Sequence, residues 1–281
     1  MKETWLMGVL DGKAAIVTGS ARGIGRAAAE LLCSHGARVL VNDLDGELAE
    51  DAAAQIDGET AVFAGDLTAE GVPEALVRAA VDAFGRLDIV VNNAGYTWDG
   101  IAHKMGDDQF RAMLEIHTVA PFKVLRAASP YLRDAGKVDR EEGREMFRKV
   151  VNVTSISGTQ GNVGQVNYAA AKAGLVGLTK TLAREWGPFK VNVNAVAFGF
   201  IDTRLTASAD DGATIERDGR EIKLGIPPQM RELAGTIIPL GRPGTPEEAA
   251  GAIFFLSSPW SNFVHGQVLT VNGGQMTGMT E

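Results

Sequence analysis

Short apolar runs alternate with longer helical patterns along almost the whole chain, and this alternation limits the fold more than any other feature. Each run is nearly continuous in apolar residues, which is typical of strands that are covered on both faces. The alternation therefore predicts a mostly parallel sheet with helices on both faces. The seven runs are 13–18, 37–42, 60–65, 87–92, 149–154, 190–196 and 267–272.

The helical patterns between these runs complete a doubly wound α/β fold of the Rossmann type, and we expect a single domain over residues 1–281. Pro121 and Pro130 lie inside one long pattern and predict a kink or break there. The patterns cover residues 24–35, 45–56, 71–84, 107–133, 166–186 and 246–257.

Two segments interrupt the alternation. Residues 134–148, "DAGKVDREEGREMFR", are highly charged and are expected to form a solvated extension. Residues 199–240 form a long excursion that contains glycine and proline and follows the sixth run. A segment of that length after a strand is often a lid, so we expect a substrate lid near 199–240.

Composition excludes several classes of function. The net charge is −8 and no long basic run occurs, so nucleic-acid binding is not expected. The only cysteine, Cys33, lies in the apolar run "AAAELLCSHGA" and is interpreted as a core residue in a reducing compartment. No apolar run could span a membrane, the N-terminus does not resemble a signal peptide, and the four histidines are scattered. We expect a cytoplasmic protein without a metal site.

A glycine cluster, "VTGSARGIGRA", follows the first strand and opens the first helix. Gly19, Gly23 and Gly25 would let the backbone turn tightly and approach a pyrophosphate, which the free N–H groups of the helix N-terminus attract. Arg22 and Ile24 lie within the same loop. The spacing is a variant of the dinucleotide-binding fingerprint, and its position between strand and helix predicts a dinucleotide site.

An acidic residue after the second strand bears on the choice of dinucleotide. Asp43, in "VNDLD", lies twenty residues beyond Gly23 and can accept hydrogen bonds from ribose hydroxyls. It would repel a 2′-phosphate, so we expect NAD(H) as the preferred cofactor. Arg22 favours the opposite choice, and NADP(H) remains possible. Asp43 could instead cap the next helix, although Asp45 could also do so.

Two further motifs follow predicted strands, at the edge of the sheet where open α/β folds bind ligands. "AGDLT" places Asp66, beside Leu67, where it could face the adenine amino group. "VNNAG" places Asn93 where it can tie neighbouring loops together, while Ala94 and Gly95 leave room for a cofactor.

Tyr168 and Lys172, in "NYAAAKAGL", are four residues apart in an alanine-rich stretch, so they share one face of a predicted helix. The pair could be solvated on a surface, or it could transfer protons. A nearby cation favours the phenolate of a tyrosine, whose ordinary pKa is about 10.

Taken in order, "TGSARGIG", "NNAG", "NVTSISG", "YAAAK" and "GQVLTVNGG" give the chain a resemblance to the short-chain dehydrogenase/reductase family, from Gly12 to Gly274. The resemblance implies that Tyr168 is the catalytic acid/base, that Lys172 lowers its pKa and holds the nicotinamide ribose, and that Ser155 binds the substrate oxygen.

The chain departs from the family pattern at two positions. His117, in "LEIHTVAPF", stands where the family has an asparagine, and its ring could shuttle protons or simply be packed. Phe198 precedes Gly199 where a proline is usual, and the following "FIDTRLT" implies that Ile201 and Thr203 contact the nicotinamide carboxamide and the pyrophosphate.

These motifs predict an NAD(P)(H)-dependent oxidoreductase that interconverts a secondary alcohol and a ketone. "GTQGNVGQVNYAAAKAGL" resembles 3-oxoacyl reductases of the family, and "VNDLD" with His117 resembles its 3-hydroxyacyl dehydrogenases, so a 3-oxoacyl or 3-hydroxyacyl thioester is the expected substrate. A steroid, a polyol or another secondary alcohol remains open, as does a catalytically silent nucleotide-binding regulator. The family resemblance also implies a homotetramer.

The predicted lid has residues that could contact such a substrate, although ordinary lid packing and solvated charges would explain them equally well. Arg204, Lys223 and Arg231 could meet a phosphopantetheine or coenzyme A phosphate. The apolar residues that could cover an acyl chain are Leu205, Ile215, Leu224, Ile226, Pro227, Met230, Leu233 and Ile237.

Overall fold

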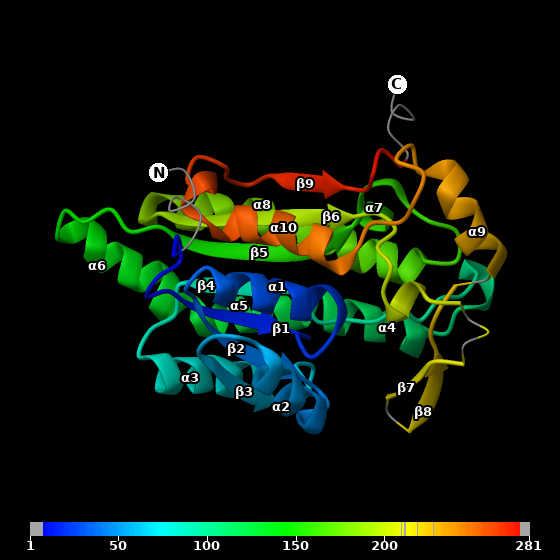
Figure 1. The fold of residues 1–281 in the computed structure, drawn as a ribbon, viewed down its shortest axis with the longest axis horizontal. Helices are drawn as coiled ribbons and strands as arrows, with labels where there is room; N and C mark the ends of the chain where they lie inside the picture. Colours follow the sequence, from blue (N-terminus) through cyan, green and yellow to red (C-terminus); the bar gives the residue numbers. More distant parts are fainter. Residues whose placement is uncertain (1–7, 209, 211, 218, 227, 276–281) are drawn as a thin grey trace.

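The computed structural model of the protein describes residues 8–208, 210, 212–217, 219–226 and 228–275. Seven parallel strands form one sheet in the order β3-β2-β1-β4-β5-β6-β9 (Figure 1), which confirms the predicted α/β fold. The strand order reverses between β1 and β4, so a crevice opens there beyond the carboxyl ends of the strands. The strands are β1 (Ala14–Thr18), β2 (Arg38–Asp43), β3 (Thr60–Ala64), β4 (Ile89–Asn92), β5 (Arg148–Ser155), β6 (Val191–Phe198) and β9 (Val268–Val271).

Helices cover both faces of the sheet because successive strand side chains point to opposite sides. Val17 of β1 belongs to the core cluster that packs under α1, α2 and α10, whereas its neighbour Ile16 belongs to the cluster under α3, α5 and α8. The helices are α1 (Gly23–Ser34), α2 (Gly46–Gln55), α3 (Val72–Phe84), α4 (Asp107–Leu114), α5 (Ala120–Ser129), α6 (Ala135–Glu141), α7 (Ile156–Gln160), α8 (Val166–Trp186), α9 (Pro228–Ile237) and α10 (Pro246–Ser257).

The helical pattern with two prolines does not break. Instead, π-helical turns at Glu115–Val119 and Pro130–Asp134 connect α4, α5 and α6 into one continuous run. A π turn widens the helix by one residue and so accommodates a proline ring that an α turn would reject. The first of these turns carries His117 toward the crevice.

The charged segment 134–148 is only partly a solvated extension. Its first half forms α6, and Arg148 begins β5. Asp139 and Arg148 are both buried and form an ion pair of 2.8 Å, so the expectation of a fully solvated segment was wrong for these two side chains. The attraction between the two charges offsets the free-energy cost of removing each of them from water.

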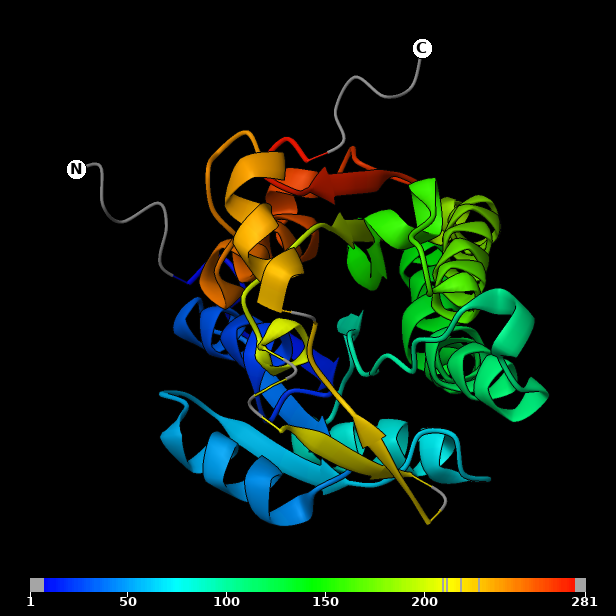
Figure 2. The same ribbon diagram turned by 90° about the vertical axis from the view of Figure 1, so that its right-hand side faces the viewer.

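The segment after β6 returns across the carboxyl ends of the strands (Figure 1). It contains an antiparallel hairpin, β7 (Thr214–Arg217) and β8 (Arg220–Lys223), followed by α9. Figure 2, which faces this end of the sheet, shows the hairpin and α9 in front of the strand ends. Ile222 of the hairpin is buried in a small apolar cluster with Tyr96 and residues of α4. No helix among the described residues is both long and apolar enough to cross a membrane.

Candidate active site

A groove of about 500 Å³ runs along the carboxyl ends of the strands that begin the chain. The glycine loop forms its floor. Gly19 and Gly23 have positive φ angles of 62° and 57°, and a Cβ atom at Gly25 would lie 2.3 Å from the carbonyl oxygen of Gly19. These positions therefore need glycine, as a loop that closely approaches a ligand requires. Ile24 and Arg22 line the same groove.

The loop after β4 holds the glycine loop in place. The Asn93 side-chain amide donates hydrogen bonds of 2.9 Å to Thr18 O and 3.0 Å to Gly19 O, and the Thr18 hydroxyl accepts from Ala94 N. A Cβ atom at Gly19 would lie 2.7 Å from the Ala94 Cα atom, so the two loops touch. Asn93, Ala94 and Gly95 all line the groove, as the sequence predicts.

Acidic side chains line the groove beyond the ends of β2 and β3. Asp43 ends β2, and its carboxylate accepts from Ala21 N at 3.3 Å and Leu44 N at 2.9 Å. Asp45, rather than Asp43, caps α2 by accepting from Leu48 N. Asp43 is therefore not needed as the cap. Asp66 and Leu67 line the groove beside it.

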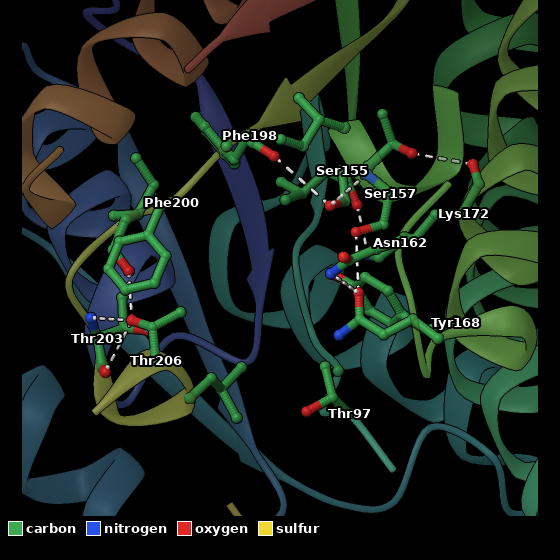
Figure 3. Close-up of a pocket in the computed structure, with 18 of the residues that line it drawn as sticks. Thr97, Ser155, Ser157, Asn162, Tyr168, Lys172, Phe198, Phe200, Thr203 and Thr206 are labelled. Carbon is green, nitrogen blue, oxygen red and sulfur yellow. Dashed lines mark hydrogen bonds between the residues drawn. The ribbon is translucent and has the colours of Figure 1, made fainter. Parts of the chain in front are cut away.

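A second cavity, of about 240 Å³, adjoins the groove and lies between β5, α8 and the segment after β6 (Figure 3). Ser155 ends β5 and caps α7 by accepting from Ser157 N at 3.1 Å. The Ser155 hydroxyl also donates a long bond of 3.5 Å to Phe198 O. In Figure 3, Ser155 and Tyr168 lie on one side of this cavity, and Phe200 faces them.

Tyr168 and Lys172 occupy successive turns of α8, as predicted, and both line this cavity. The Lys172 ammonium is buried, donates to Val153 O at 2.7 Å and lies 5.5 Å from the centre of the Tyr168 ring. Burial lowers the pKa of Lys172 to about 7.

The pKa of Tyr168 differs in direction from the expectation. Desolvation in the cleft raises it to about 12, and a hydrogen bond with Ser155 offsets only part of that rise. The expectation of a phenol made acidic by Lys172 was therefore wrong for the protein alone. The reason is that burial disfavours the charged phenolate, and the nearby Asp99 carboxylate acts in the same direction.

His117 packs against this pair. Its ring lies edge-on to the Tyr168 ring with 5.0 Å between centres, and its Nε2 atom lies 2.7 Å from Tyr96 O. A carbonyl only accepts, so Nε2 carries the hydrogen, and Nδ1 of a neutral ring is then an acceptor. Burial and the Lys172 charge hold the pKa of His117 well below its usual range, which keeps the ring neutral. Nδ1 is buried and has no partner among the described residues.

The segment after β6 closes the cavity. Gly199, Ile201 and Thr203 line it, and a Cβ atom at Gly199 would lie 2.6 Å from Asn272 Cβ. Of the lid residues expected to contact a substrate, Leu205 and Ile226 line this cavity, whereas Ile215 lines the groove. Leu224 is buried elsewhere, Leu233 and Ile237 are exposed, and Pro227 and the Met230 side chain lie outside the described residues.

The three cations of the lid have different surroundings. Arg231 is bound to Asp202 and Thr206 O, each at 2.8 Å, and so holds the segment together. Lys223 is exposed on the hairpin and lines neither space. Arg204 lines the groove of the glycine loop, not the cavity of Tyr168.

Sequence reasoning missed several residues of the site. The hairpin places Thr214, Ile215 and Glu216 on the groove. The Asp-Gly pair in the sequence "ERDGRE" is a hairpin signal that was not used. Tyr96 lines both spaces. Phe200 and Gln275 line the cavity of Tyr168. Phe200 opens the run "FIDTRLT" without being singled out there, and Gln275 reaches the cavity only because the chain returns through β9.

Comparisons with known proteins agree with this geometry. The family model described as enoyl-(acyl carrier protein) reductase matches residues 19–276. The chain is similar to the proteins named 3-oxoacyl-[acyl-carrier-protein] reductase FabG of Vibrio cholerae, Aquifex aeolicus and Vibrio harveyi, with identities of 37%, 38% and 39%. In each case the match covers 94% of this chain and 98% of the relative.

Proposed function

Because this chain belongs to the short-chain dehydrogenase/reductase family of nicotinamide-dependent oxidoreductases, we propose that it reduces a 3-oxoacyl thioester to the 3-hydroxyacyl thioester with NADH. One observation carries the proposal. Ser155, Tyr168 and Lys172 line a single cavity that adjoins the groove of the glycine loop. Hydroxyl, phenol and amine groups at one cavity suit proton transfer to a carbonyl oxygen.

The groove fits a nicotinamide dinucleotide. Its glycine positions admit no side chain, and it passes Asp43 and Asp66 before it reaches the cavity of Tyr168. When bound, the nicotinamide supplies the hydride that reduces the carbonyl carbon. Gly199, Ile201 and Thr203 are the residues placed to hold its carboxamide and the adjoining phosphates.

Tyr168 acts as the proton donor. A phenol whose pKa is about 12 stays protonated at neutral pH, which is the form that a reductase needs. The Ser155 hydroxyl can exchange its long bond to Phe198 O for one to the substrate oxygen, where negative charge develops. In its protonated form Lys172 has two N–H groups beyond its bond to Val153 O, and these can hold the ribose.

His117 is proposed as a positioning residue for this pair. Its ring packs against the Tyr168 ring, and its Nδ1 atom is a buried acceptor on the side of Gly95. A Cβ atom at Gly95 would lie 2.1 Å from His117 Cε1, so the loop after β4 and the histidine fit together only with glycine at 95.

NADH is the proposed cofactor because Asp43 lines the groove with its carboxylate held by the backbone N–H groups of Ala21, Leu44 and Asp45. A carboxylate fixed in this way can accept from ribose hydroxyls and repels a 2′-phosphate.

Residues 199–240 are the proposed substrate lid. Leu205 and Ile226 present apolar surface to the cavity, which suits an acyl chain. Cytoplasmic location and a homotetramer stay predictions.

The direct test is the loss of NADH absorbance with a short 3-oxoacyl thioester, with NADPH in a parallel assay and with steroid ketones and ketoses as competing substrates. We expect the thioester to be reduced fastest and NADH to be preferred. Tight NADH binding with no turnover of any ketone would instead indicate a nucleotide-binding regulator. Faster turnover of a steroid or sugar would reassign the substrate.

A further inference from the structure

Arg204 lies where the segment after β6 meets the glycine loop. It begins the short turn Arg204–Thr206, which the Thr203 and Thr206 side chains cap. A Cβ atom at Gly23 would lie 3.7 Å from Thr203 Cγ2, so this turn rests against the glycine loop. The guanidinium consequently stands at the rim of the dinucleotide groove, although the residue belongs to the proposed substrate lid.

Carboxylates share this groove with Arg204, since Asp43, Asp45, Asp66 and Glu216 line it as well. Arg22 of the glycine loop lines the same groove, and among the described residues neither arginine has a hydrogen bond or an ion pair for its guanidinium. The carboxylate facing them, Asp43, is already held by backbone N–H groups. Partial burial and the neighbouring charge of Arg22 lower the pKa of Arg204, and Asp43 opposes that change. Two unpaired guanidinium groups side by side are stabilised by an anion between them.

We propose that Arg204, together with Arg22, binds a phosphate group of the dinucleotide, so that a lid residue takes part in holding the cofactor. The proposal rests on the proposed function, since it assumes that a dinucleotide occupies the groove. Planar guanidinium groups bind phosphate in a bidentate manner. The phosphate is either the pyrophosphate, which NADH and NADPH share, or the 2′-phosphate, which only NADPH carries.

Because Arg231 binds both Asp202 and Thr206 O, the turn that carries Arg204 is fixed to α9. A phosphate bound by Arg204 would therefore connect the cofactor to the lid. Leu205 and Ile226, which line the substrate cavity, belong to the same proposed lid.

The test measures the dissociation constants of NADH and NADPH by fluorescence titration of the wild-type chain, Arg204→Gln, Arg204→Lys and Lys223→Gln. Lys223 is the matched control, an exposed cation of the same lid that lines neither space. We expect Arg204→Gln to weaken binding about tenfold, Arg204→Lys to weaken it less, and Lys223→Gln to leave it unchanged.

The two cofactors distinguish the two phosphates. Equal losses for NADH and NADPH indicate the pyrophosphate, and a loss confined to NADPH indicates the 2′-phosphate. Unchanged affinity of Arg204→Gln for both cofactors, or an equal loss in Lys223→Gln, would overturn the proposal. Failure of the wild-type chain to bind either cofactor would instead refute the proposed function, so the two failures are distinguishable.

Discussion

Two buried lysines stand at opposite ends of the sheet, and the pKa of each is lowered to about 7 by burial. Lys149, at the amino end of β5, uses all three N–H groups, because its ammonium donates to Asn192 Oδ1, Ser261 Oγ and Asn262 Oδ1 at 2.8–3.2 Å. Lys172, at the carboxyl end, donates to one described protein oxygen and faces a cavity. The comparison teaches that a displaced pKa does not by itself identify a reactive group.

Two histidines repeat the contrast. His265, near the amino end of β6, lies 2.7 Å from Ala183 O through Nε2 and accepts from Val193 N through Nδ1. His117, at the carboxyl end, makes the equivalent carbonyl contact but leaves Nδ1 without a partner among the described residues. Lys149 and His265 thus find their partners within the protein, whereas Lys172 and His117 keep a donor and an acceptor for a ligand.

The largest effect should come from the group that we propose as the acid. Tyr168→Phe removes the hydroxyl and keeps the ring against His117, so kcat should fall by about 10³-fold or more while NADH binding changes little. Steady-state assays and fluorescence titration measure the two quantities separately. A variant that retained most of its activity would remove Tyr168 from the mechanism and with it the distinction between the two ends of the sheet.

Exchange of the two lysines for methionine tests the contrast directly. Lys172→Met should lower kcat by about 10²-fold and weaken NADH binding, because its free N–H groups face the cavity. Lys149→Met should leave kcat and KM within about twofold at a temperature where it stays folded, because its N–H groups serve only protein oxygens. Equal losses of activity in both variants would contradict the comparison.

The sequence predicted the parts of the site that depend on local geometry. Gly19, Gly23 and Gly25 are readable because a tight turn before a helix requires them, and Tyr168 and Lys172 because helical spacing fixes a shared face. The seven parallel strands were predicted for the same reason, since each apolar run is local.

What depends on distant segments could not be predicted. The direction of the Tyr168 pKa depends on how much water the folded cleft excludes. The groove position of Arg204 depends on how the segment after β6 returns to the glycine loop. The first π turn, in the pattern where a kink or break was expected, depends on packing against α8, where the Thr118 hydroxyl donates to Ala171 O.

Substitutions of the two histidines should differ less in their effect on kcat than substitutions of the two lysines. His117→Phe keeps a ring beside Tyr168 and removes both nitrogens, so kcat should fall about tenfold, while His117→Gln, whose side-chain amide can take the place of Nε2 and donate to Tyr96 O, should lose less. The pH profile of kcat should stay parallel to that of the wild type, because the neutral His117 contributes no ionisation near neutral pH.

His265→Phe is the matched control. It leaves Val193 N without its acceptor, while Ala183 O keeps its hydrogen bond from Gly187 N, so it should lower the free energy of unfolding by about 1–3 kcal/mol and leave kcat unchanged. Loss of activity in this variant, at a temperature where it stays folded, would show that the two ends of the sheet are coupled.

The last prediction has no effect on kcat and concerns stability alone: burial of Lys149 should make the free energy of unfolding depend on pH. The pKa of Lys149 is about 7 in the folded chain, against 10.5 for the free group. Between these pH values the unfolded chain binds a proton that the folded chain does not, so the free energy of unfolding rises with pH by up to about 1.4 kcal/mol per pH unit. Below pH 7 both states are protonated, and this contribution is constant.

Denaturant unfolding of the wild type and Lys149→Met at several pH values between 7 and 10 isolates the contribution of Lys149, because Lys172 is common to both proteins. The wild type should gain stability relative to the variant as pH rises. A constant difference would mean that the three oxygens around Lys149 keep it protonated in the folded protein. The two lysines would then differ in charge as well as in their hydrogen-bond partners.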